Sequence, residues 1–494
     1  MTDRPEPAPV ALCPSGQLRA LLGALDGRRV TLMGLGLFGG GEGAARFVVE
    51  RGARLVITDL RDADALSEPL ARLGDLGVEC VLGRHRAEDF TECDLVIANP
   101  AVSRSNTYLR AAQAAGIPIT SPMNIFLACS PAPVAAVTGS NGKSTTTALL
   151  AAMLEAAGRR VWMGGNIGVS LLPLLGEIET QDIVVLELSS FQLSDAGALP
   201  WSPHLAVVTN LTPNHLAWHG GFRAYAAAKR NIVRHQGDSD FAVLNGRSQV
   251  LCGWVREGVP GRAVLFDSNP RPGRLGDGMI LVGDRLVWRQ GRRDQVVCTT
   301  HDVPLPGFHN VENAMGAAAG ALCLGADGPA VREALSTFVG LAHRLEPVGE
   351  WHGVRFYNDS YSTTAESVVA ALESFRGPLL LIAGGYDKHL DLSAIAEAAA
   401  RRVEVLVTIG QTGPELAQQT RREGVYVGRT VLVREADSLR EAVLTARGLA
   451  MPGTAVVFSP GCASYDMFDN YRHRGEEFKR VVKEVHRQER ARGA

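Results

Sequence analysis

Short apolar runs that end at glycine alternate with helical patterns over most of the chain. The first unit of this kind predicts a strand over 30–36, a helix over about 41–51 and a strand over 54–60. The second predicts a strand over 134–138, then a glycine-rich turn and a helix that starts at Ser144. Strands that alternate with helices are typical of parallel sheets covered by helices, so the pattern predicts an α/β protein.

The pattern changes in two places along the chain. Between about 261 and 300, short alternating runs (AVLFD, MILVG, RLVW and QVVC) predict a small antiparallel excursion. From about 341 the alternation of strands and helices resumes with VRFYND, PLLLIAGG, VEVLVTIG and AVVFSPG. At 494 residues the chain is too long for one hydrophobic core. We therefore predict three α/β domains, over 1–121, 122–340 and 341–494.

Composition excludes several classes of protein. The formal net charge of −2 provides no basic field for a nucleic acid or an anionic membrane, and no apolar run approaches the ~20 residues that span a bilayer. The eight cysteines are scattered without a C-x-x-C pair, which disfavours a disulfide framework or a structural zinc site. The proline-rich start, MTDRPEPAPVALCP, is not expected to be a signal peptide, and the first ~25 residues are expected to be a disordered extension. We expect a reducing, aqueous compartment, the cytoplasm.

The strongest chemical signal is TGSNGKST, Thr138–Thr145, between a predicted buried strand and a predicted helix. Its glycines let backbone N–H groups approach phosphate oxygens, Lys143 can reach the outer phosphates and the Ser144 hydroxyl can bind Mg²⁺. The spacing is shorter than in the standard phosphate loop, because Val137 stands where the first glycine is expected. A tight turn with an incidental lysine is the alternative, but the strand–loop–helix context favours a nucleotide site.

A phosphate loop needs an acidic partner for its metal, usually at the end of a neighbouring strand. Glu187 follows four apolar residues in IVVLELSS, where an unpaired carboxylate would be costly to bury. We therefore expect Glu187 to meet a cation or hydrogen-bond donors; a structural ion pair is the alternative.

A second glycine-rich segment lies near the N-terminus. GLGLFG, residues 34–39, is a full G-x-G-x-x-G after a predicted strand, and Asp59 ends the next strand at about the offset of a Rossmann-like domain. Taken alone, the motif favours a nicotinamide or flavin enzyme. However, its glycines report only a backbone that approaches a pyrophosphate, and UDP contains that group as well.

A series of motifs in fixed order resembles the Mur ligase family and spans residues from about 30 to 480. TGSNGKST is followed by GGNIG (164–168), LELSSFQL (186–193), TNLTPNHL (209–216), AAAKRNI (226–232), GFHNVENAMGA (307–317), AHRLE (342–346), NDSYSTT (358–364), GGYDK (384–388) and SPGCASYDMFDNY (459–471). The resemblance implies Rossmann-like first and third domains and a central P-loop ATPase domain. It is strongest to members that use ATP to add glutamate to UDP-N-acetylmuramoyl-L-alanine through an acyl phosphate in peptidoglycan precursor synthesis.

The resemblance also implies the residues of each site. ATP would contact Gly139, Asn141, Gly142, Lys143, Ser144, Thr145, Asn310, Asn313, Arg344 and Asp359. Two Mg²⁺ ions would be held by Ser144, Glu187, His215 and Lys229, the last as a carbamate formed with CO₂; Lys143, His215 and Lys229 are the implied catalytic residues. The UDP-sugar would contact Gly34, Leu37, Phe38, Gly39, Asp59, Arg61, Asn99, Asn166, Ser189 and Gln192. The amino acid would contact Thr363, Lys388, Ser464 and Tyr471. From chemistry alone, a helical lysine such as Lys229 is a solvated charge and a lone histidine such as His215 is structural.

Several residues depart from the family pattern. Tyr361 stands where glutamate-adding members commonly have lysine, Tyr471 replaces a frequent phenylalanine, and Asn214 and Ala217 stand where acidic residues are common. These departures leave the phosphate loop intact but leave the amino acid open, with D-glutamate as the default and L-glutamate or another amino acid as the alternative. An NAD-dependent oxidoreductase and a non-catalytic nucleotide-binding protein are further alternatives. We expect a monomer without nucleic-acid or membrane partners.

Overall fold

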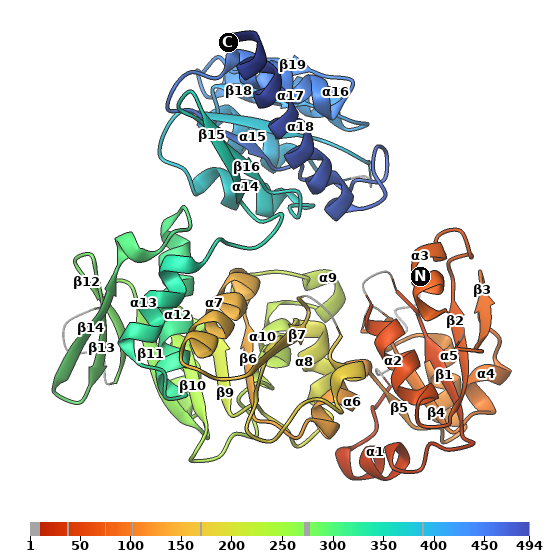
Figure 1. The fold of residues 1–494 in the computed structure, drawn as a ribbon. Coiled ribbons are helices and arrows are strands. Elements are labelled where there is room, and N and C mark those ends of the chain that lie inside the picture. The colour runs from red at the N-terminus through yellow and green to blue at the C-terminus, as the bar shows by residue number, and fades with distance from the viewer. Residues whose placement is uncertain are drawn as a thin grey trace. The chain divides into compact units, whose positions relative to one another are not determined.

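The computed structural model describes residues 10–36, 39–74, 76–100, 102–167, 170–270, 277–387 and 390–493. The chain forms two compact units, Met1–Asp302 with Glu312–Ser336, and Val303–Val311 with Thr337–Ala494, which we describe separately (Figure 1). Among the helices in the described ranges, none combines the length and the apolar character needed to cross a lipid bilayer.

The first unit begins with a five-stranded parallel sheet in the order β3-β2-β1-β4-β5. Its strands are β1 (Arg29–Met33), β2 (Arg54–Asp59), β3 (Glu79–Leu82), β4 (Leu95–Ala98) and β5 (Ile119–Thr120). The helices along this stretch are α1 (Ser15–Leu22), α2 (Gly40–Val49), α3 (Ser67–Leu73), α4 (Glu88–Thr91), α5 (Thr107–Ala114) and α6 (Pro122–Cys129). The strand–helix–strand unit expected over 30–60 is confirmed to within a few residues.

The expectation of a disordered extension over the first ~25 residues is wrong for the described part of that segment. Leu18 and Leu22 lie one helical turn apart on α1, both are buried, and α1 packs against α6. The Cys13 amide also donates a hydrogen bond to the Ile119 carbonyl at 2.8 Å. The prolines before α1 favoured disorder in the sequence, whereas its short apolar stripe covers one end of the first sheet's core.

The second sheet of this unit has nine strands in the order β14-β13-β12-β11-β10-β9-β6-β8-β7. They are β6 (Val134–Thr138), β7 (Val161–Gly165), β8 (Ile183–Glu187), β9 (Leu205–Val208), β10 (Phe241–Asn245), β11 (Arg262–Asp267), β12 (Gly278–Val282), β13 (Arg285–Gln290) and β14 (Arg293–Thr299). Every residue of β6 and β8 is buried, as expected for central parallel strands with both faces covered. These two strands end side by side, at Thr138 and Glu187.

The antiparallel excursion is smaller than the alternating pattern suggested. Strands β12, β13 and β14 form an antiparallel meander, but β11, which contains AVLFD, is parallel to both β10 and β12. From Val264 onward, buried and partly exposed residues alternate along β11, which indicates that one face of the sheet is less covered at this position. An alternation of that kind reports a half-covered strand and not its direction.

Helices and 3₁₀ turns complete the second sheet's domain and lead into the second unit. They are α7 (Lys143–Ala156), η1 (Leu172–Leu174), α8 (Ser190–Ala196), α9 (Leu216–His219), α10 (Phe222–Arg230), α11 (Gln249–Glu257), η2 (Thr300–Asp302), α12 (Phe308–Cys323) and α13 (Gly328–Thr337). The first residues of α12 belong to the second unit and its remainder to the first.

A buried ion pair joins the two sheets of the first unit. Arg104, which follows β4, donates from Nε and Nη2 to the two carboxylate oxygens of Asp195 on α8, at 2.9 and 2.5 Å. The Asn124 side-chain amide donates to the backbone carbonyl of Asp195 at 2.9 Å. The segment after β4 is therefore tied to α8 by both charge and hydrogen bonds.

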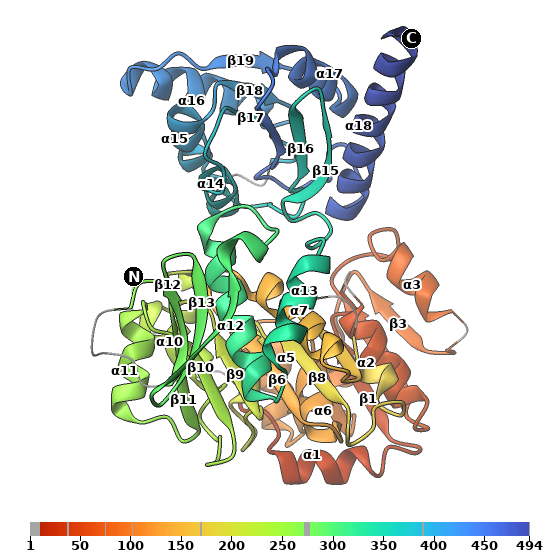
Figure 2. The same cartoon turned by 60° about the vertical axis from the view of Figure 1, so that its left-hand side comes forward.

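The second unit contains a six-stranded sheet in the order β15-β16-β20-β17-β18-β19, in which only β15 is antiparallel. Its strands are β15 (Glu346–Trp351), β16 (Val354–Asn358), β17 (Leu379–Ala383), β18 (Val405–Thr408), β19 (Leu432–Glu435) and β20 (Ala455–Phe458), and its helices are α14 (Ala365–Glu373), α15 (Ser393–Arg402), α16 (Gly413–Tyr426), α17 (Leu439–Leu449) and α18 (Tyr471–Gly493). Helices α14, α15 and α16 pack on one face and α17 and α18 on the other (Figure 2).

Candidate active site

The phosphate loop connects β6 to α7 through two glycines that no other residue could replace without strain. Gly142 has φ +79°, and a Cβ there would lie 2.1 Å from the Asn313 side-chain oxygen; at Gly139 a Cβ would lie 1.9 Å from the Thr209 hydroxyl. Lys143 begins α7, and its Nζ donates to the Ser140 carbonyl at 2.8 Å. Backbone amides at the N-terminus of this 14-residue helix thus border a tight loop, a geometry suited to phosphate.

The segment after β9 holds this loop in place. The Thr209 hydroxyl and the Asn210 side-chain amide both donate to the Asn141 carbonyl, at 2.6 and 3.0 Å, and the Asn141 amide donates to Asn210 Oδ1 at 2.9 Å. Ser140 Oγ donates to the Thr212 carbonyl at 2.8 Å. The family motif that contains TNLT gave Thr209, Asn210 and Thr212 no predicted role. The available signal was that neighbouring parallel strands bring the residues after them to one edge of a sheet.

Glu187 meets hydrogen-bond donors, as expected for a buried carboxylate. Ser144 Oγ donates to Glu187 Oε2 at 2.5 Å, and the Asn166 side-chain amide donates to Oε1 at 2.7 Å. Only 1% of Glu187 is exposed. The pairing of β6 with β8 places the carboxylate beside the first turn of α7. Asn166, predicted to contact the UDP-sugar, therefore uses its amide to orient this carboxylate.

Lys229 is buried and not a solvated charge, so the expectation from chemistry alone is wrong. It is 1% exposed on α10, its Nζ donates to the Thr138 hydroxyl at 3.1 Å, and it lies 5.0 Å from the centre of the Tyr225 ring. Burial holds the pKa of Lys229 well below its ordinary value; the charge of Lys143 lowers this pKa further, while Glu187 opposes the change. The neutral amine that burial favours is the form that reacts with CO₂.

Tyr225 connects this lysine to the phosphate loop. Its phenol oxygen lies 2.8 Å from Ser140 Oγ, and burial raises the pKa of the Tyr225 hydroxyl. The ring of His219 lies 5.4 Å from the Tyr225 ring, so the loop, the lysine helix and α9 are in contact.

The two histidines of α9 and its N-cap differ in environment. His215 has φ +51° immediately before α9, and its ring lies 5.0 Å from Phe191. His219 is hydrogen bonded to Ser190 Oγ at 2.9 Å, and burial lowers the pKa of His219 to about 4, with smaller contributions from His215 and Lys229. His219 therefore stays neutral near pH 7.

The donor set fits magnesium better than a softer metal. Within the described residues, no group of three or more His, Cys, Asp and Glu side chains could hold a metal ion. The adjacent Ser144 hydroxyl and Glu187 carboxylate offer oxygen donors, which Mg²⁺ prefers. A carbamate on Lys229 would supply a further carboxylate.

The N-terminal glycine-rich segment brings together three of its predicted residues. Gly34 and Gly36 have φ +85° and +70°, and the Asn99 side chain packs against both. Asp59 accepts hydrogen bonds from the amides of Leu35 and Arg61, each at 3.0 Å. Asp59 is therefore bound to the loop itself. Gly39 also has a positive φ, +83°, and the Arg61 side chain is exposed, whereas Leu37 and Phe38 lie outside the described residues.

Ser189 and Gln192 have a structural role at the start of α8. The Gln192 backbone amide donates to Ser189 Oγ at 3.2 Å, and the Ser189 backbone amide donates to Gln192 Oε1 at 2.9 Å. This arrangement is a capping box. Gln192 also lines a cavity of about 100 Å³, together with Asn99 and Gly40. That cavity lies between the first unit's two sheets.

In the second unit, a buried carboxylate organises the loops that follow β16 and β20. Asp359 accepts hydrogen bonds from the hydroxyls of Ser362 and Ser459 at 2.6 and 2.7 Å, and from the Leu345 amide at 3.1 Å. Burial raises the pKa of Asp359 to about 6 despite these donors. The Arg344 guanidinium lies 3.6 Å from the centre of the Tyr361 ring. Arg344, Asp359 and Tyr361 are thus neighbours.

Asn310 and Asn313, predicted to act together, fall in different units. The Asn310 side-chain amide donates to the Pro306 carbonyl at 2.7 Å, whereas Asn313 lies beside Gly142.

Two of the predicted amino-acid contacts, Ser464 and Tyr471, lie next to a buried cation that the sequence did not indicate. Arg474 is 1% exposed and donates to Ser360 Oγ and to the carbonyls of Cys462 and Ala463, at 2.9–3.0 Å. Burial lowers the pKa of Arg474 to about 10. A single sequence gives no signal for its burial, because it sits among charged residues. The predicted contacts are Ser464, which is buried, Thr363, Tyr471, whose ring lies 5.0 Å from Tyr361, and Lys388, which lies outside the described residues.

Comparison with known proteins places the chain in a family. Family models described as Mur ligase MurD-like, N-terminal domain, Mur ligase middle domain, and Mur ligase, glutamate ligase domain match residues 28–121, 137–321 and 343–462. A UDP-N-acetylmuramoylalanine–D-glutamate ligase of Roseiflexus sp. (strain RS-1) is 42% identical over 463 residues, covering 93% of this chain and 99% of the relative. A protein of the same name from Symbiobacterium thermophilum is 39% identical, with coverage of 92% and 97%.

A solved structure is similar in fold. The MurF ligase from Thermotoga maritima in complex with ADP has a TM-score of 0.53 and 15% identity, and covers 94% of this chain and 97% of that one. The three α/β sheets, the phosphate loop and the matched relatives lead to one assignment. The chain belongs to the Mur ligase family.

Proposed function

We propose that the chain is the cytoplasmic ATP-dependent ligase that adds D-glutamate to UDP-N-acetylmuramoyl-L-alanine in peptidoglycan precursor synthesis. Relatives that carry the corresponding name match over nearly the whole chain. The observation that carries the proposal is the contact of Ser144 with the buried Glu187, beside a loop that admits only glycine at two positions. The ADP bound in a protein of similar fold also supports nucleotide use.

The proposed reaction activates a carboxylate. Because oxide is a poor leaving group, the carboxylate of the UDP-linked substrate first takes the γ-phosphoryl group of ATP, which forms an acyl phosphate and releases ADP. The amine of glutamate attacks the acyl carbon, and inorganic phosphate leaves from the tetrahedral intermediate. Such chemistry depends mainly on positioning and charge neutralisation. The loop amides and Lys143 would hold the β- and γ-phosphates.

Magnesium would be held by oxygen donors and by one histidine. Ser144 and Glu187 would bind one ion, while His215 and a carbamate on Lys229 would bind a second near the substrate carboxylate. Bound Mg²⁺ would neutralise charge on the phosphates. The burial of Lys229, which lowers the pKa of its amine, supports the carbamate, because an ammonium cannot add CO₂.

The remaining substrates would bind to separate domains. Residues 1–121 would hold the uridine diphosphate, through Gly34, Asp59 and Asn99 among others; residues 122–340 would hold ATP; and residues 341–494 would hold the amino acid. The aromatic pair Tyr361 and Tyr471 would border the amino-acid site, in place of the lysine and phenylalanine of related ligases. We propose that the enzyme acts as a monomer.

A phosphate-release assay tests the proposal. Release should require UDP-N-acetylmuramoyl-L-alanine, glutamate and Mg²⁺ together, and D-glutamate should support it where L-glutamate does not. Lys143→Ala should lower turnover by about 10²–10³-fold, the typical loss for one electrostatic contact to a transition state. The matched control is Lys483→Ala, an exposed lysine on α18. Undiminished turnover in Lys143→Ala would contradict the nucleotide assignment, and release with L-glutamate alone would change the substrate.

A further inference from the structure

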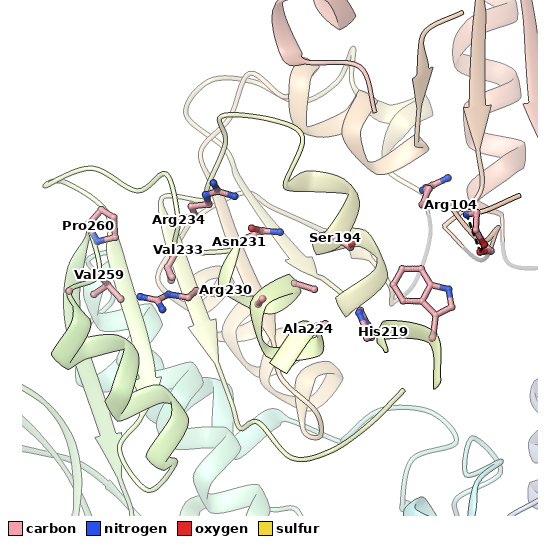
Figure 3. Close-up of a pocket in the computed structure, with 16 residues that line it drawn as sticks. Arg104, Ser194, His219, Ala224, Arg230, Asn231, Val233, Arg234, Val259 and Pro260 are labelled. Atoms are coloured by element: carbon pink, nitrogen blue, oxygen red, sulfur yellow. Dashed lines mark hydrogen bonds between the residues drawn. The ribbon is translucent and has the colours of Figure 1, made fainter. Parts of the chain in front are cut away.

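A cavity of about 800 Å³ lies in the first unit, behind the helix that carries Lys229. Its wall comes from the segment after β4, from α8, α9 and α10, and from the turn after α11. Figure 3 shows Arg230, Arg234, Val259 and Pro260 at one end, and Arg104 at the other, with Ser194, Ala224 and Asn231 between them. The volume falls within the ~300–1,000 Å³ typical of small-molecule sites.

Helical spacing separates this cavity from the proposed substrate sites. On α10, Tyr225 and Lys229 are four residues apart and point to the phosphate loop, whereas Ala224 and Ala228 share the face that lines the cavity. On α8, Gln192 lines the small cavity beside Asn99, and Ser194, two residues further on, lines the large one. Both helices therefore present different faces to the two regions.

The charge of the lining selects an anion. It contains three arginines, and no acidic residue is among the described side chains that form it; the histidine of the lining, His219, is neutral near pH 7 and adds no charge. Arg234 is exposed at one end, and Arg230 beside it is paired with Glu257, outside the lining. Arginine binds phosphate with a planar fork of donors. An anionic group at this end would meet two guanidinium groups.

The other end of the cavity contains an unsatisfied donor. Arg104 is 8% exposed, and its Nε and Nη2 are used by Asp195, but its Nη1 is buried without a hydrogen-bond partner among the described residues. Buried donors are normally satisfied, so Arg104 keeps an unused donor beside the cavity. The apolar part of the wall includes Trp218 and Val233, which suit a ring or an alkyl group.

We propose that this cavity is a second ligand site, which takes a small organic phosphate ester with an apolar body, and that its occupant slows turnover through α10. Helix α10 packs against α8, and Lys229 is flanked in sequence by the lining residues Ala228 and Arg230. An occupant that presses on Ala224 and Ala228 would move the Lys229 amine away from the Thr138 hydroxyl. Small displacements of a catalytic group lower turnover strongly. The binding step is independent of the proposed function; only the effect on turnover rests on it.

Phenyl phosphate is a suitable probe, and phenol is its uncharged counterpart. Binding to the full chain is measured by calorimetry with Mg²⁺ and a saturating non-hydrolysable ATP analogue, which fills the phosphate loop. One equivalent of phenyl phosphate should bind and phenol should not, and higher salt should weaken the binding. Arg234→Glu should weaken it at least tenfold. Arg223→Glu, an exposed arginine on α10 outside the lining, should leave it unchanged.

Two outcomes would overturn the site: no binding once the loop is filled, or equal affinity in Arg234→Glu and the wild type. Circular dichroism spectra that match the wild type should show that both variants are folded. For the effect on turnover, saturating phenyl phosphate should lower phosphate release at least twofold in the wild type and leave Arg234→Glu unaffected. Unchanged turnover in a wild type shown to bind the probe would overturn the coupling. Inactivity with every amino acid would contradict the proposed function and leave the binding result intact.

Discussion

Removing one member of the buried ion pair between Arg104 and Asp195 should weaken the first unit more than removing both. Both side chains are nearly inaccessible, with 9% and 4% exposed. Burial raises the pKa of Asp195, and Arg104 only partly offsets the change, so each charge depends on its partner. Asp195→Leu leaves a buried guanidinium without a counter-ion, and Arg104→Met leaves a buried carboxylate in the same condition.

The magnitude follows from this burial. Breaking a buried pair by removing one partner costs about 3–5 kcal/mol, whereas an apolar pair of similar volume is often neutral. A cooperative unit of this size has an unfolding entropy of roughly 0.7 kcal/mol/K, so each single variant should lose about 4–7 °C in Tm. The double variant, Arg104→Met with Asp195→Leu, should lose less than either single variant.

Scanning calorimetry and urea denaturation of the four proteins give the coupling free energy directly. Amide hydrogen exchange in α8 and α6 assigns the loss to the correct unit, because Asn124 of α6 also donates to the Asp195 backbone. Single variants that each cost under ~1 kcal/mol, or a double variant whose loss equals the sum of the singles, would refute the reasoning. Either result would mean that water screens the pair as at a surface.

Three further predictions concern the site. Lys229→Ala should lower phosphate release by about 10²-fold or more, and depletion of CO₂ should slow the wild type but not the variant; a wild type indifferent to CO₂ would argue against the carbamate. Gly142→Ala combines a left-handed conformation that costs about 1–2 kcal/mol with a 2.1 Å clash, so kcat/KM for ATP should fall at least tenfold, whereas Gly253→Ala, with no atom within 4 Å of the new Cβ, should have no effect. Asp359 has a pKa of about 6 in the folded state, above its unfolded value of ~3.9, so its contribution to stability is complete below pH ~3.9 and is lost as pH rises through 6. The second unit should therefore gain about 1 kcal/mol between pH 7 and pH 5 in urea denaturation, and the absence of any difference from Asp359→Asn in this pH dependence would contradict the assignment.

Features that depend on a local pattern could be predicted from the sequence. Strands β6 and β8 are continuous apolar runs because both faces are covered, and each ends at a polar residue, Thr138 or Glu187. Burial of Glu187 among donors followed from the cost of an unpaired carboxylate. The glycines of the phosphate loop could also be interpreted from the sequence, because glycines between a strand and a helix indicate a tight turn.

Features that depend on sheet order or tertiary burial could not be predicted. The hydrogen bonds from Thr209 and Asn210 to the phosphate loop require β9 to lie beside β6. The local sequence of neither strand specifies that neighbour. The buried Arg474 has the same local sequence signal as a solvated arginine, and Lys229 was assigned a special role only through the family motif. Strand β11 was misread because alternating burial does not report strand direction.

The hydrogen bonds from Thr209 and Asn210 to the phosphate loop also bear on protein engineering. Thr209 lies 68 residues further along the chain than Asn141, the loop residue whose carbonyl it binds. The eight-residue motif transplanted into another strand–helix junction would arrive without these donors, and its backbone would be free to adopt other conformations. A successful graft would have to carry β9 and its following turn, and also β8 with the Glu187 carboxylate, so the smallest transferable nucleotide-binding module in this protein includes three neighbouring strands.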